Sequence, residues 1–230
     1  MERFVEESGT RAVVRTTWRL AAPRARVWAA LTDPQQLADW FDTVDTVPAA
    51  VGDRYRLADS ATEGGIRTCE QGHHLGFSWE YGEDVSEVEL HLEEDTPPEA
   101  PSTAGADGSS AAGTGGEGAG EQGASGAEVP GCRLSLTHVM DANEHWVRYG
   151  PGATGLGWDG ALLALSMYLR GEDGCDPASM TAFFASPMGH LWIEEAASGW
   201  EAAHVAAGAE DSAARACAHR TMTAYTGSAA

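Results

Sequence analysis

The segment from Gly157 to Gly171, GWDGALLALSMYLRG, constrains the fold more than any other part of the chain. It has the length and composition of a helix, and Asp159 is its only charged residue before Arg170. Leu163 and Met167 lie on one apolar face. A second apolar stripe, at helical spacing, consists of Trp158, Leu162, Leu165 and Leu169. A helix with two apolar faces is stable in water only when two surfaces cover it.

Several segments alternate between apolar and polar residues, the pattern of a strand with one buried and one exposed face. They lie at residues 13–20, 74–81, 86–94 and 132–140, with weaker candidates at 53–58 and 65–70. Together they predict a curved antiparallel sheet with one wet face and one dry face. With the helices, this makes the expected fold class α+β.

Helices are expected before and after the sheet segments. One begins at Pro23 and ends near Asp33, because proline suits a first helical position and the residue before a proline resists helix. A short helix around Trp40 follows. Residues 172–230 are predicted to form a helical C-terminal extension with amphipathic helices at 186–208 and 211–225. We expect this extension to cover Leu163 and Met167, either in the same chain or in a homodimer formed through helix 156–170 and the C-terminal helices.

Residues 96–130 interrupt two strand-like segments. This stretch contains nine Gly, eight Ala and five acidic residues, with no basic or aromatic residue. Such a composition does not offset the entropy of ordering, so the segment is predicted to be a disordered insertion in a hairpin loop. A long loop adds only slowly to the cost of closing the hairpin.

The net charge of −21 argues against nucleic acid and against anionic membranes as partners. No apolar run approaches the roughly 18–20 residues of a membrane span. The N-terminus lacks the apolar core of a signal peptide, so we expect a cytoplasmic protein. No G-x-S-x-G, H-E-x-x-H or P-loop pattern is present, and no cofactor is predicted.

Five segments occur in an order that resembles a known family. They are AAPRARVWAALTDPQQLADWF at 21–41, VGDRYRL at 51–57, LGFSWEY at 75–81, RLSLTH at 133–138 and the apolar helix at 157–171. The set is similar to the homologues of the activator of Hsp90 ATPase, within the START/Bet v1-like (SRPBCC) superfamily. The resemblance assigns residues 11–171 to one domain and does not extend to the insertion or to the extension at 172–230.

This resemblance implies a helix-grip fold, in which a curved antiparallel sheet wraps a long C-terminal helix around an apolar cavity. Members of the superfamily bind lipids, sterols, hormones or polyketides, some catalyse cyclisation, and the eukaryotic namesake acts on a chaperone. A fold alone does not choose among such functions. The residues expected to line the cavity are Trp18, Trp40, Tyr55, Phe77, Trp79, Tyr81, Leu90, Leu136, His138, Trp158, Leu162 and Leu165.

His138 is the candidate catalytic residue, because strand alternation places it on the inward face with Leu134 and Leu136. It could serve as a general base or as an anchor for a polar ligand group. The alternative is a strand-end histidine satisfied by backbone or water. His73 and His74 are adjacent and point to opposite faces. A metal site that includes His91 or His138 is conceivable, but no ligand spacing supports it, so no metal site is predicted.

Two segments near the apolar helix are candidates for a gate over the cavity. Residues 144–149 are expected to form a loop that closes over its mouth or an ordinary polar loop. The glycine-rich segment 150–157 is expected to give the gate mobility.

Three functions fit these observations. The favoured hypothesis is non-catalytic binding of a small hydrophobic molecule, in a regulatory or stress-response role. The alternatives are a cavity-based enzyme, such as a cyclase or hydrolase using His138, and a chaperone-associated interaction module that docks through its tail.

Overall fold

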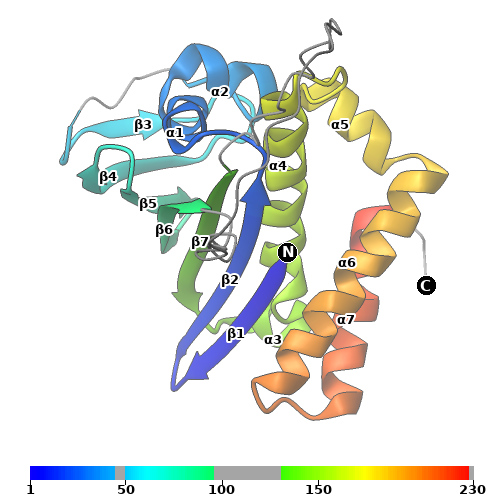
Figure 1. Cartoon of the computed structure of the whole chain (residues 1–230). Coiled ribbons are helices and arrows are strands. Elements are labelled where there is room, and N and C mark those ends of the chain that lie inside the picture. The colour runs from blue at the N-terminus through cyan, green and yellow to red at the C-terminus, as the bar shows by residue number, and fades with distance from the viewer. Residues whose placement is uncertain (45–49, 96–130, 228–230) are drawn as a thin grey trace, which may run out of the picture.

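The computed structural model describes residues 1–44, 50–95 and 131–227. The predicted disordered insertion at 96–130 lies outside these residues. Within them, one antiparallel sheet of seven strands has the order β1-β2-β7-β6-β5-β4-β3 (Figure 1). The strands are β1 Glu2–Ser8, β2 Arg11–Leu20, β3 Arg54–Arg56, β4 Glu63–Glu70, β5 His74–Tyr81, β6 Asp84–Asp95 and β7 Gly131–Asp141.

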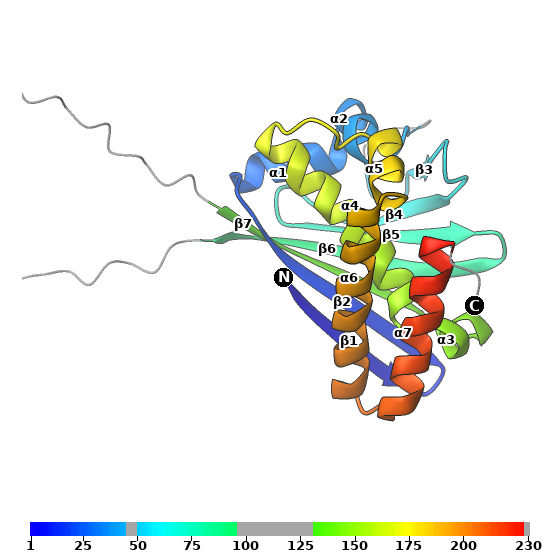
Figure 2. The same ribbon diagram turned by 90° about the vertical axis from the view of Figure 1, so that its right-hand side faces the viewer.

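The helices pack against the sheet and against one another. The long helix α4 lies between the sheet and the two C-terminal helices, and α6 and α7 run side by side (Figures 1 and 2). In chain order they are α1 Arg24–Thr32, α2 Pro34–Trp40, α3 Glu144–Tyr149, α4 Gly152–Arg170, α5 Pro177–Phe184, α6 Pro187–Ala206 and α7 Asp211–Thr226. None of these helices is long and apolar enough to cross a membrane.

Three elements were not predicted from the sequence. Strand β1 was missed because only Val5 among its residues is buried, which leaves no alternation to detect. Residues 144–149 form a helix rather than a loop, since the Asn143 side chain accepts a hydrogen bond from the Trp146 N–H at 3.1 Å and caps it. Helix α5 has a similar start, with the Asp176 carboxylate accepting from the Ser179 N–H.

The glycine-rich segment 150–157, which was expected to be mobile, is mostly helical. Helix α4 already begins at Gly152, and both Gly152 and Gly155 are buried in its first turns. A Cβ at Gly155 would lie 2.2 Å from Cε2 of Trp200 on α6. The glycines of this segment therefore let the tail helices approach α4 closely, which is a packing role.

The tail of the same chain covers part of the second face of α4. Trp200 on α6 lies over Gly155, and Phe184 on α5 lies against Gly160. Leu163 and Met167 are half-buried. A second core cluster joins the tail to β1 and β2, and it comprises Val5, Ala12, Val14, Trp146, Leu156, Ile193, Ala196, Ala197 and Trp200.

The single acidic residue of the apolar helix, Asp159, is completely buried. Its carboxylate accepts hydrogen bonds from Arg3 Nε at 2.8 Å, Thr16 Oγ1 at 3.0 Å and Trp200 Nε1 at 2.8 Å. These partners come from β1, β2 and α6, so one carboxylate on α4 connects four elements. The Arg3 guanidinium also lies 5.7 Å from the centre of the Trp200 ring.

Replacing Asp159 tests how strongly this connection supports the fold. Asp159→Ala leaves the partly buried Arg3 guanidinium and two further donors without their acceptor. We expect a loss of about 3–5 kcal/mol in the free energy of unfolding, measured by denaturant titration. The exposed Asp173→Ala is the matched control and should leave stability unchanged. A loss below about 1 kcal/mol for Asp159→Ala would contradict this account.

Candidate ligand cavity

A cavity of about 400 Å³ lies between the inner face of the sheet and helices α1, α2 and α4. No charged side chain is found among the described residues that line it. The exposed lining residues Ala50, Cys69 and Gln71 mark the side that is open to solvent. Its lining residues include Trp28, Leu31, Leu37, Trp40, Phe41, Tyr55, Leu57, Ile66, Leu75, Phe77, Trp79, Leu90, Leu136, Trp158, Ala161 and Leu162.

Aromatic rings form one continuous wall of the cavity. The rings of Phe41 and Trp158 are stacked with centroids 6.4 Å apart and an interplanar angle of 15°. Trp79 meets Trp158 edge-on at 5.1 Å, and Phe77 lies 6.4 Å from Trp79. Tyr55 meets Phe77 edge-on at 5.7 Å. Phe41 at the end of α2, helix α4 and strands β3 and β5 thus contribute rings that touch their neighbours.

The polar ends of three of these aromatic residues are used by the protein itself. Trp40 Nε1 donates to the Ala30 carbonyl at 3.0 Å, and Trp158 Nε1 donates to His138 Nδ1 at 2.9 Å. The Tyr55 hydroxyl donates to the Ser78 carbonyl at 2.8 Å. Each ring is therefore fixed through its polar end.

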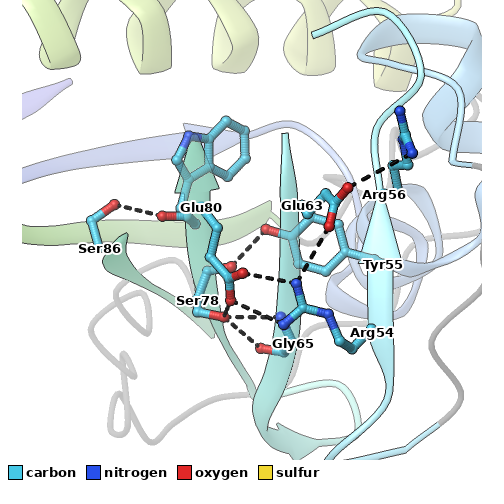
Figure 3. A network of polar contacts seen from close by, with 9 residues as sticks. Arg54, Tyr55, Arg56, Glu63, Gly65, Ser78, Glu80 and Ser86 are labelled. Carbon is cyan, nitrogen blue, oxygen red and sulfur yellow. Dashed lines mark hydrogen bonds and ion pairs between the residues drawn. The ribbon is translucent and has the colours of Figure 1, made fainter. Parts of the chain in front are cut away.

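Strand β3 is held in place by a network on its outer side (Figure 3). Arg54 makes paired hydrogen bonds to the Glu80 carboxylate at 3.2 and 2.7 Å, which lowers the Glu80 pKa. The Tyr55 ring lies over Gly64, where a Cβ would be 2.5 Å from the ring. Burial raises the pKa of Tyr55, so the phenol keeps its proton for the bond to Ser78. The network thus fixes one edge of the cavity wall.

Few polar groups of the lining are left for a ligand. Within the described residues, no hydrogen bond is made by the indole N–H of Trp28 or Trp79 or by the side-chain amide of Gln71. The Thr32 hydroxyl, in contrast, already donates to the Trp28 carbonyl at 2.8 Å. The lining is therefore mainly apolar, and few of its polar groups are without a partner within the described residues.

The structure brings together most of the residues expected at the cavity. Those in the lining are Trp40, Tyr55, Phe77, Trp79, Leu90, Leu136, Trp158 and Leu162. Tyr81 is outside because it ends β5 and is 63 % exposed. Trp18 is also outside, and its indole donates to Thr16 Oγ1 at 3.1 Å. Leu165 is fully buried in the core between α4 and the sheet.

His138 is buried but does not line the cavity. An indole can only donate, so the bond from Trp158 requires an unprotonated Nδ1 on His138. The neutral ring then carries its proton on Nε2 and donates to Ser86 Oγ at 2.7 Å. Ser86 Oγ in turn donates to the Trp79 carbonyl at 3.1 Å. Both ring nitrogens are thus occupied by side chains, and the enzymatic hypothesis loses its candidate base.

Four lining residues from α1, α2 and the end of α2 were not among those expected at the cavity. They are Trp28, Leu31, Leu37 and Phe41. The number of large apolar residues in these two short helices could have indicated their position, because such helices must cover a large apolar surface.

Comparison with known proteins agrees with this geometry. Residues 21–119 match the family described as Activator of Hsp90 ATPase homolog 1-like protein. This part of the chain is therefore similar to that family. The sheet, the long helix α4 and the cavity between them are the helix-grip fold of the START/Bet v1-like superfamily. No curated protein sequence matches the chain.

Two solved structures of CalU16 from Micromonospora echinospora are similar to this chain. The crystal structure has 25 % sequence identity and a TM-score of 0.56, and covers 88 % of this chain and 96 % of its own. The solution structure has 26 % identity and a TM-score of 0.62, and covers 90 % and 96 %. The matched share of this chain is larger than residues 1–171 alone, so the similarity to CalU16 includes part of the helical extension.

The buried position of His138 predicts a pH-dependent stability. Burial lowers its pKa to about 4, whereas the unfolded chain protonates a histidine near pH 6.5. Between these values the unfolded state binds a proton that the folded state does not, so stability falls as the pH falls. From pH 7 to pH 5 we expect His138 to account for a loss of about 2 kcal/mol.

Denaturant titrations of the wild type and His138→Gln at pH 7 and pH 5 measure this loss. The variant should lose less stability than the wild type over this range. His219→Gln, which changes an exposed histidine on α7, should behave as the wild type. Equal losses in the wild type and His138→Gln would disprove the assignment.

Proposed function

We propose that this protein binds a small, predominantly apolar molecule in the cavity between its sheet and helices α1, α2 and α4. The observation that carries the proposal is an uncharged hollow of about 400 Å³ lined mainly by aromatic and aliphatic side chains. Small-molecule sites typically have volumes of about 300–1,000 Å³ and this kind of lining. Protein interiors otherwise contain few voids larger than a water molecule.

The lining indicates the chemistry of the ligand. Aromatic faces of Phe41, Phe77, Trp79 and Trp158 offer stacking and edge contacts to a ring system. The unpaired donors at Trp28, Trp79 and Gln71 suit one or two acceptor oxygens at the edge of the molecule. With no charged lining residue, a strongly ionic ligand would lose its hydration without a compensating partner.

Non-catalytic binding accounts for these observations better than catalysis does. His138 donates to Ser86 rather than facing the cavity, and its Nδ1 accepts from Trp158. The regulatory or stress-response role, the homodimer and the chaperone partner are further predictions, and cavity binding does not require any of them.

Filling the cavity tests the proposal. Ala161 on α4 is a small lining residue, and Ala161→Phe adds a ring to the hollow. We expect the wild type to bind Nile red, a neutral apolar dye, with enhanced dye fluorescence and a change in tryptophan emission. The variant should bind it at least about tenfold more weakly, since the added ring takes the space of the ligand.

Ala202→Phe is the matched control, because Ala202 is exposed on α6 away from the cavity. Native mass spectrometry of the purified protein provides an independent measurement, with a co-purified small molecule expected in the wild type and absent from Ala161→Phe. The proposal fails if both variants bind the dye as the wild type does and no bound molecule is detected.

A further inference from the structure

The outer face of the sheet carries a cluster of side chains that the cavity does not use. Leu75 and Leu90 line the cavity. Their neighbours His74 on β5 and Glu89 and His91 on β6 point to the opposite face, because successive residues of a strand alternate. Each of these three residues offers a ligand atom, and the three atoms lie within 4.8 Å of one another.

The strand register brings the two imidazoles together. His74 and His91 are direct partners across β5 and β6. The Leu92 N–H donates to the His73 carbonyl at 2.8 Å, so the next pair, His74 and His91, is of the type in which side chains approach more closely. Their rings are stacked with centroids 4.0 Å apart and an interplanar angle of 15°.

The carboxylate of Glu89 completes the cluster. Glu89 is the cross-strand partner of Gly76, and a Cβ at Gly76 would lie 2.6 Å from Oε2 and 2.9 Å from Oε1 of Glu89. The missing side chain therefore gives the carboxylate room to lie across β5. There its Oε2 contacts His74 Nε2 directly.

We propose that His74, Glu89 and His91 bind one divalent cation of the zinc type, with a nitrogen from each histidine and an oxygen from the carboxylate. Imidazole and carboxylate ligands suit Zn²⁺ and related transition ions, whereas Ca²⁺ and Mg²⁺ prefer oxygen ligands throughout. Three protein ligands leave a fourth position open for water or an outside group. This site is on the other side of the sheet from the cavity and does not depend on the proposed ligand.

Small side-chain movements complete the coordination geometry. A tetrahedral ion with bonds of about 2.1 Å holds its ligand atoms about 3.4 Å apart. His74 and Glu89 have side chains that are 19 % and 34 % exposed, and His91 is exposed, so solvent reaches all three. The strand register holds the three side chains close together, and rotation about their side-chain torsions would bring the ligand atoms into tetrahedral positions.

Calorimetric titration of the metal-free full chain with Zn²⁺ tests the site. We expect one ion to bind, with an affinity lowered by more than about tenfold in His74→Gln, Glu89→Gln and His91→Gln. Gly76→Ala should also weaken binding, because its methyl group displaces the carboxylate. His73→Gln is the matched control, since His73 is adjacent in sequence but contacts Arg24 and lies outside the cluster.

Cysteine coordination is distinguished by two further measurements. Cys69→Ser, which removes an exposed thiol, should leave Zn²⁺ binding unchanged. The Co²⁺ form should lack the near-ultraviolet sulfur-to-metal absorption of a thiolate ligand. In the wild type, Zn²⁺ should protect His74 and His91, but not His73, from diethyl pyrocarbonate, as read by mass spectrometry. Absence of saturable binding, or binding lost in Cys69→Ser but kept in His91→Gln, would overturn the proposal.

Discussion

The carboxylate of Asp159 connects parts of the molecule that the apolar contacts alone would not orient. It lies in the helix that the sheet grips and accepts from Arg3, Thr16 and Trp200, which belong to two strands and a tail helix. A buried charge is tolerated only with such partners, since the cost of removing it from water is large. Apolar packing permits many arrangements of α6 on α4, whereas three hydrogen bonds to one carboxylate permit few. Asp159 therefore fixes how the tail docks.

This docking explains how one helix serves two surfaces. On the side facing α6, helix α4 presents Gly155, Asp159 and Gly160, over which Trp200 and Phe184 pack closely. On the other side it presents Trp158, Ala161 and Leu162 to the cavity. Close packing against the tail positions α4 from the side away from the cavity. One helix thus packs against the tail on one side and borders the cavity on the other.

The sequence predicted the parts of this structure that rest on periodic patterns. The alternating segments identified β2, β5, β6 and β7, and helical spacing identified the stripe of α4 that faces the sheet. Strand β1 lacked any such pattern, since it is an edge strand with a single buried side chain. The role of the glycines in α4 could not be read from the sequence either. Whether a glycine gives mobility or admits a neighbour depends on what lies above it, here Trp200.

The same limit applies to the candidate sites. Strand alternation predicted that His138 points inward, and it does, but its neighbours decide its chemistry. Trp158 supplies a donor to one nitrogen and Ser86 receives the proton of the other, so an inward histidine holds the cavity wall instead of facing a ligand. His74 and His91 are the opposite case. They are 17 positions apart and form no recognisable spacing, yet the hairpin register makes them stacked partners. A single sequence specifies each strand well but specifies the pairing between strands only through the turns. Chemistry that depends on pairing therefore becomes visible only in the folded sheet.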